Sequence, residues 1–171
     1  APDSPALRHK LGTALGMSGD AVGAVREFEE VVRRWPDYAK GQYSLGVVLA
    51  SSGRHQEAVV RFTAAARSDP ADAQAHLQLA ETQRVLSRFT DAVGPYERAL
   101  ALDPRLAPAH FGHAMALVGA RRYRDALNGL NRATALFPGQ GAFPHAAARL
   151  LAAAPEDGVR DGRRALTLLH S

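Results

Sequence analysis

The stretch ALDPRLAPAHFGHAM, residues 101–115, places two prolines, Pro104 and Pro108, between apolar segments that otherwise suit helices. Proline recurs in similar surroundings along the chain, each time 34 residues further on, at Pro36, Pro70, Pro104 and Pro138. A fixed period of this size is typical of a repeat array, in which each unit buries its apolar face only against its neighbours. The sequence therefore predicts four tandem units, at 5–38, 39–72, 73–106 and 107–140.

The four units, numbered from position 1 to position 34, share a pattern of apolar and small residues. Positions 7, 8 and 11 lie on one face of a first helix, and positions 20, 24 and 27 lie on one face of a second helix. Position 8 holds Gly12, Gly46, Ala80 and Ala114; position 20 holds Ala24, Ala58, Ala92 and Ala126; position 24 holds Phe28, Phe62, Tyr96 and Leu130. We expect the small residues to lie where two helices approach closely, and the proline at position 32 to end the second helix.

This pattern closely resembles the tetratricopeptide repeat (TPR) family over residues 5–138, without an insertion or deletion. The resemblance implies an all-α, right-handed solenoid of four helix-turn-helix repeats, followed by a degenerate helix pair. We accordingly divide the chain into four tandem TPRs at 1–138 and a fifth pair at 139–171 that acts as a cap or as an interface. In the fifth pair, the 20-24-27 spacing falls on Gly162, Leu166 and Leu169.

The resemblance also implies that the first helices line a concave groove, which positions 2, 5, 9 and 12 commonly face. We predict that a partner contacts a set of groove residues: His9, Lys40, Tyr43, Val47, Gln74, Leu77, Gln78, Glu81, Arg84, Phe111 and Met115. The apolar members suit a peptide with aliphatic anchors, or alternatively pack between neighbouring helices. The Asn at position 9 with which family members clamp a C-terminal carboxylate is missing from every unit, so we do not expect a chaperone-tail adaptor.

Composition and spacing argue against several other kinds of site. The 171 residues include no Cys, which excludes disulfides and thiolate metal sites. No apolar run approaches the roughly 18 residues of a membrane span. The net charge is +4, but the clustered Arg residues lie at helix ends without interleaved aromatics, so nucleic acid is not an expected partner. His110 and His113 have an i, i+3 spacing that suits a metal, yet both fall at packing positions, and we predict no metal, cofactor or catalytic site.

The sequence therefore predicts a non-catalytic scaffold or adaptor that holds a protein or peptide in its groove. The alternative is a structural subunit that stacks end to end into filaments or another homo-oligomer, with end residues such as Leu7, Leu166 and Leu169 at the contact. An Ala- and Arg-rich composition indicates a bacterial source. The chain begins APDSPA rather than with Met, so we expect either the bacterial cytoplasm or, for a processed N-terminus, the periplasm or the exterior.

Overall fold

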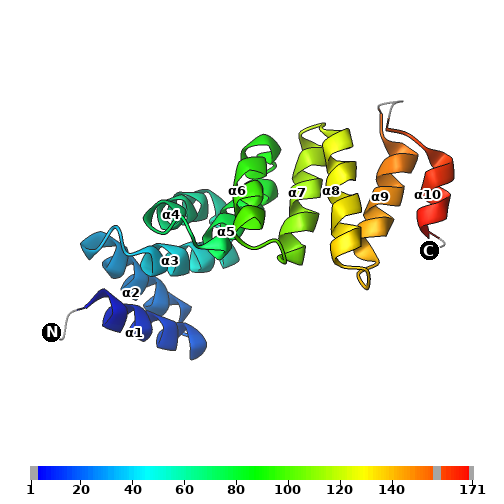
Figure 1. Cartoon of the computed structure of the whole chain (residues 1–171). Helices are drawn as coiled ribbons and strands as arrows, with labels where there is room; N and C mark the ends of the chain where they lie inside the picture. Colours follow the sequence, from blue (N-terminus) through cyan, green and yellow to red (C-terminus); the bar gives the residue numbers. More distant parts are fainter. Residues whose placement is uncertain (1–3, 156–158, 170–171) are drawn as a thin grey trace. The chain divides into compact units, whose positions relative to one another are not determined.

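A computed structural model describes residues 4–155 and 159–169, which form ten α-helices and no strand (Figure 1). The helices are α1 (Pro5–Met17), α2 (Ala21–Arg34), α3 (Ala39–Ser51), α4 (His55–Ser68), α5 (Ala73–Val85), α6 (Phe89–Leu102), α7 (Ala107–Gly119), α8 (Tyr123–Leu136), α9 (Ala142–Ala153) and α10 (Gly162–Leu169). The predicted all-α fold of helix pairs is confirmed.

Each second helix from α2 to α8 stops two residues before the repeating proline. The intervening residue is Trp35, Asp69, Asp103 or Phe137, and its backbone leaves the helical region, as at Trp35 with φ −133° and ψ 74°. A proline disfavours the α conformation in the residue before it, because its Cδ clashes with that residue. The proline at position 32 therefore ends the helix and starts the connection to the next pair.

The residues at positions 8, 20, 24 and 27 form the interior of the helix pairs. Position 20 is a buried Ala in every repeat, and position 24 is a buried Phe, Tyr or Leu beside it. A Cβ added at Gly12 would lie 2.7 Å from Cε1 of Phe28, and one added at Gly46 would lie 2.7 Å from Cε1 of Phe62. The glycines are thus required by the close approach of an aromatic ring, which confirms the predicted role of the small residues.

The turn between the two helices of each repeat needs one residue in the left-handed region. That residue is at position 15 in all four repeats: Gly19 (φ +89°), Gly53 (φ +76°), Ser87 (φ 57°) and Arg121 (φ 61°). Only glycine adopts this conformation without a steric cost. The first two repeats therefore have the favoured residue, and the last two hold a side chain in a strained backbone conformation.

The chain divides into two compact units, residues 1–86 and residues 87–171. In the first unit, α1 to α4 each pack on the next helix in sequence, and α3 also contacts α1 and α5. In the second unit, α6 to α10 pack in the same successive order. The division falls between α5 and α6, and the boundary at residues 138 and 139 remains a prediction.

The last helix leaves two of the residues marked by the repeat spacing at the surface. Leu166 is 60% exposed and Gly162 is also exposed, whereas Ala165 and Val159 are buried. The side chain of Leu169 lies outside the described residues. Helix α10 has only eight residues, and Asp161 caps it by accepting a hydrogen bond from the backbone N–H of Arg164.

Replacement of Arg121 by Gly is expected to stabilise the second unit. Removing a side chain from a residue in the left-handed conformation stabilises the folded state by about 1–2 kcal/mol. The greater conformational freedom of glycine in the unfolded chain offsets about 0.4–1 kcal/mol of this gain. The net gain of about 0.5–1 kcal/mol is measurable by thermal or urea unfolding. The reciprocal control, Gly53→Ala, should lower stability by a similar amount, and equal midpoints for the three proteins would contradict this account.

Candidate functional site

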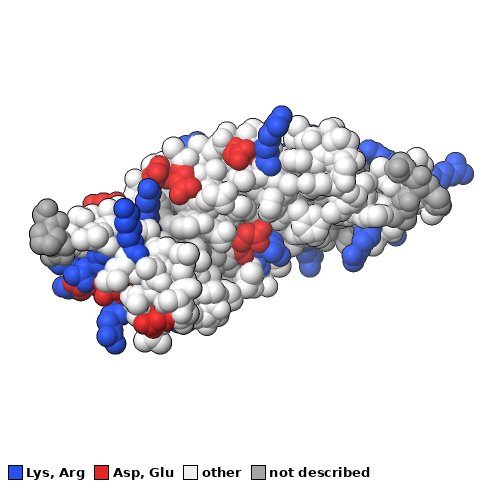
Figure 2. All heavy atoms as spheres, turned by 90° about the horizontal axis from the view of Figure 1, so that it is seen from below, with Lys and Arg blue, Asp and Glu red and all other residues white. Residues whose placement is uncertain are grey.

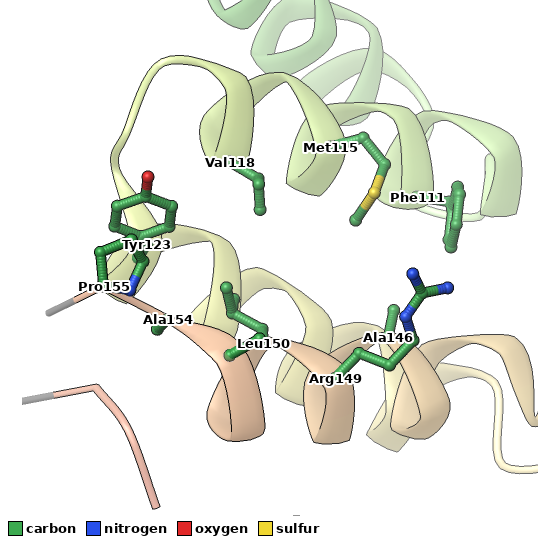
Figure 3. A pocket seen from close by; sticks show the side chains of 10 residues that line it. Phe111, Met115, Val118, Tyr123, Ala146, Arg149, Leu150, Ala154 and Pro155 are labelled. Atoms are coloured by element: carbon green, nitrogen blue, oxygen red, sulfur yellow. The ribbon is translucent and has the colours of Figure 1, made fainter. Parts of the chain in front are cut away.

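A hollow of about 460 Å³ lies in the second unit between α7 and α9 (Figure 3). Its described lining comes from four parts of the chain: Phe111, Met115 and Val118 of α7, Tyr123 at the start of α8, Ala146, Arg149, Leu150 and Ala153 of α9, and Ala154 with Pro155 after it. This volume falls in the range of about 300–1,000 Å³ that is usual for ligand sites. The lining is mostly apolar, as such sites usually are.

The two helices form the hollow because of the spacing of their side chains. Phe111, Met115 and Val118 follow each other at i, i+4 and i+7, so they project from one face of α7 toward α9. Leu150 projects back toward them, and Ala146 beside it has a small side chain that leaves space open. Ala153, three residues after Leu150, also lines the hollow with a small side chain. The hollow therefore results from two large residues on one helix facing alanines on the other.

Two of the predicted groove residues, Phe111 and Met115, are thus brought together at one site. Phe111 is 39% exposed, which is high for an aromatic side chain with no polar atom. Figure 3 shows its ring at the same end of the hollow as the guanidinium of Arg149, whereas Tyr123 and Pro155 lie at the other end. The ring forms part of the apolar wall that a ligand would meet first.

In the first unit, some of the predicted groove residues of α1 and α3 contact side chains of neighbouring helices. His9 Nε2 lies 2.8 Å from the hydroxyl of Ser44, which joins α1 to α3. The ring of Tyr43 packs edge-on against Phe62 at 5.8 Å between centroids, and burial, followed by the charge of Asp72, raises the pKa of Tyr43. These contacts fix the side chains in place and leave part of each one exposed, whereas Lys40 and Val47 are exposed.

Helix α5 carries the remaining predicted groove residues of the first unit. Leu77 is only 6% exposed, so it packs in the interior and offers a ligand little surface. Glu81 and Arg84 form an ion pair with 2.7 Å between Oε2 and Nη2. Gln74 is exposed and Gln78 is half-buried, so these two amides are the polar groups that α5 leaves available.

The sequence interpretation missed the α9 side of the hollow and Tyr123. The signal was present, because Ala146, Arg149, Leu150 and Ala153 have the i, i+3, i+4, i+7 spacing of one helix face. It was overlooked because residues 139–171 depart from the repeat pattern and were predicted only as a cap or an interface. A repeat that has lost its consensus residues can still supply half of a binding surface.

The two histidines of α7 contact different neighbours. His110 Nε2 lies 2.9 Å from the carbonyl oxygen of Pro104, and its ring packs against Phe137. The ring of His113 instead lies against Tyr96, with Nε2 at 3.7 Å from Oε1 of Glu97. Over residues 4–155 and 159–169, no cluster of three His, Cys, Asp or Glu side chains is placed to hold a metal ion. None of the helices described is long and apolar enough to cross a membrane.

Repeated helix pairs with an apolar hollow between two first helices define a helical-repeat protein. The family model described as tetratricopeptide repeat matches residues 9–62 and 58–107, which together span more than half of the chain. The chain therefore belongs to the tetratricopeptide repeat family. A comparison with curated proteins gave no match.

Solved structures support the same fold. A double mutant of MamA from strain RS-1 aligns with a TM-score of 0.86 at 18% identity, over 98% of this chain and 92% of that one. MamA from residue 41 to the end, from Desulfovibrio magneticus RS-1, gives 0.84 at 18% identity over the same shares. YrrB, described as a TPR protein with an unusual peptide-binding site, gives 0.85 at 18% identity, over 98% of this chain and 84% of that one. Identities this low establish the fold alone.

His113 is expected to make stability depend on pH. Its side chain is 12% exposed, and burial lowers its pKa, with Arg122, Arg132 and His110 acting in the same direction and Glu97 opposing them. The unfolded chain then binds a proton more readily than the folded chain. Stability from this group is complete above the ordinary pKa of about 6.5 and falls as the pH drops below it.

The variant His113→Leu tests this expectation, since Leu occupies position 7 in the other three repeats. It should raise stability by about 1 kcal/mol at neutral pH, because the buried Nε2 has no hydrogen-bond partner. It should also reduce the loss of stability between about pH 7.5 and about pH 5.5, measured by urea unfolding. Part of the loss of stability at low pH should remain in this variant, because burial and the charge of Lys40 also lower the pKa of His9. An unchanged loss in His113→Leu would contradict the assignment, and His145→Gln is the surface control.

Proposed function

We propose that this chain is a non-catalytic interaction scaffold or adaptor that binds a peptide or protein on its first helices. The observation that carries the proposal is the hollow between α7 and α9, which contains Phe111 and Met115. These two residues were predicted as groove residues from the repeat positions that the TPR resemblance implies, and they line the hollow together. A TPR protein exposes its first helices for this purpose, and YrrB is described as having a peptide-binding site on the same fold.

The physical support is the cost of leaving this surface in water. A ligand side chain that enters the hollow removes the exposed apolar faces of Phe111 and Met115 from solvent, which contributes about 25 cal/mol for each Å² buried. The described lining offers packing surface, one phenol and one guanidinium. That combination serves recognition, in which apolar contacts supply affinity and a few polar groups supply orientation.

The first unit contributes a second, more polar surface to the proposal. Lys40, Tyr43 and Val47 lie on α3, and Gln74 with Gln78 lies on α5, which contacts α3. Tyr43 is held by Phe62 and so is a rigid contact that loses little conformational entropy on binding. His9, Glu81 and Arg84 are already bound to neighbouring groups and serve mainly to position this surface.

The double variant Phe111→Ala/Met115→Ala tests the proposal. Partners captured from cells by the wild-type chain should be purified and titrated against both proteins by calorimetry. Loss of two anchor side chains should weaken binding by at least about tenfold, which corresponds to about 1.4 kcal/mol. The matched control is Val60→Ala, at an exposed apolar position on the second helix α4. Equal affinities for the wild type and the double variant would remove the hollow from the function.

Self-assembly through the ends is a second candidate, favoured by the surface of α1. Leu7 and Leu11 are 55% and 50% exposed, although positions 3 and 7 are buried or nearly so in α3, α5 and α7. However, position 3 is Gly or Ala in those helices, and a Cβ at Gly41 would lie 2.5 Å from Cγ1 of Val31. Leu7 is too large for that junction, so a second copy would have to meet α1 in a different geometry.

Sedimentation velocity over a hundredfold range of concentration decides between the two candidates. The scaffold predicts one species near 18.2 kDa throughout, whereas self-assembly predicts a mass that grows with concentration. The variant Leu7→Ser/Leu11→Ser should abolish that growth if α1 is the contact. Growth that survives the variant would place the contact elsewhere, and a constant mass would exclude self-assembly under these conditions.

A further inference from the structure

The hollow between α7 and α9 has an unpaired positive charge at its edge. Arg149 is exposed, and within residues 4–155 and 159–169 its guanidinium makes no hydrogen bond or ion pair. Three other arginines, Arg33, Arg54 and Arg122, differ in that each binds a carboxylate three residues away at 2.6–2.8 Å. The free cation thus lies next to the apolar surface that the proposed function uses.

Neither of the two helices that form the walls of the hollow contains a carboxylate that could pair with Arg149. Helix α9 reads AFPHAAARLLAA and helix α7 reads APAHFGHAMALVG, and neither contains Asp or Glu. Arg149 is the sole Lys or Arg in either helix. Charged pairs at i, i+3 or i, i+4 are available elsewhere in the chain but not here. The two helices that face each other across the hollow therefore supply apolar surface and one positive charge.

The charge of the whole second unit has the same sign. Residues 87–171 include 11 Arg and 7 Asp or Glu, for a net charge of +4. Residues 1–86 include 10 Lys or Arg and 10 Asp or Glu, for a net charge of zero. The entire net charge of the chain thus belongs to the unit that contains the hollow, and this favours a partner with negative charge.

We propose that the hollow binds a protein segment in which a large apolar residue lies one or two residues from an Asp or Glu. The apolar side chain enters between Met115 and Leu150, and the carboxylate pairs with Arg149 at the end marked by Phe111 (Figure 3). An extended segment advances about 3.3 Å per residue, so this spacing lets both groups reach their sites together. The inference rests on the proposed function and names the chemical class of its partner.

A side-chain carboxylate fits this site better than a free C-terminus does. A C-terminal carboxylate is held by several donors, such as Asn amides with a second cation, and the described lining has one guanidinium and one phenol at opposite ends. Nucleic acid fits poorly as well. On the face shown in Figure 2 the Lys and Arg side chains form separate groups rather than one continuous stripe. Phosphate backbones require such a stripe, with aromatic rings for the bases.

Selection from a random peptide library displayed on phage tests the proposal without a known partner. The wild-type chain should enrich peptides with a large apolar residue and an Asp or Glu one or two residues away. The charge-reversal variant Arg149→Glu should enrich Lys or Arg at the same place in the motif. The matched control is Arg105→Glu, an exposed position in the same unit outside the hollow, and it should select the wild-type motif. The same acidic motif from Arg149→Glu would overturn the inference.

Affinity measurements on one enriched peptide then separate the two proposals. The peptide is acetylated, amidated and labelled for fluorescence anisotropy, which leaves its side chains as the sole carboxylates. Arg149→Ala in the protein and Glu→Gln in the peptide should each weaken binding about tenfold, and the double change should cost little more than either one. Ala146→Leu, which fills the hollow, should abolish binding of the wild-type peptide.

The outcomes are distinguishable. If Ala146→Leu abolishes binding but the enriched peptides lack an acid, the charge inference fails and the proposed function stands. If the peptides bind Ala146→Leu as well as the wild type, or if none is enriched, both proposals fail. Thermal unfolding of each variant accompanies the titrations, so that a loss of folding is recognised as such. Recovery of binding when Arg149→Glu meets the Lys form of the peptide is a readout that a purely structural role would not produce.

Discussion

The close contact between the two helices of a repeat is the constraint on which the rest of the structure depends. Position 8 must be small because the side chain at position 24 occupies the space beside it, as Phe62 does beside Gly46. Where position 8 is Ala, position 24 is Tyr96 in the third repeat and Leu130 in the fourth, and all of these residues are buried. This contact fixes the rotation of each first helix, and that rotation decides which residues, such as Phe111, face outward.

The sequence predicted the helices well because the packing constraint recurs at a fixed period. Each copy supplies independent evidence for the same helix face, and buried Ala and Phe residues follow it closely. The repeat phase does not predict burial where the period ends. Leu11 is exposed because no described helix packs on that side of α1, and Leu166 is exposed on the short helix α10. Periodicity contains no information about a helix without a repeating neighbour.

Only half of the candidate site was predicted from the sequence, because only half of it lies in the regular repeats. Phe111 and Met115 occupy repeat positions that commonly face the groove in the TPR family, so the resemblance located them. Leu77 has an equivalent position but is buried, because local packing rather than phase determines exposure. Arg149 and Ala146 belong to a pair without consensus residues, and only the structure shows that they face α7. The small size of Ala146 matters only once Leu150 and Met115 are known to lie beside it.

The unequal division of charge between the two units has a kinetic meaning. Electrostatic attraction accelerates encounter more than it strengthens the final complex, and it decays over about 8 Å at physiological ionic strength. A neutral unit of residues 1–86 would collect partners at the rate set by diffusion and orientation, whereas the unit of residues 87–171, with its net +4, would draw acidic segments in faster. The order in which a long acidic partner engages the chain would then begin at the C-terminal unit.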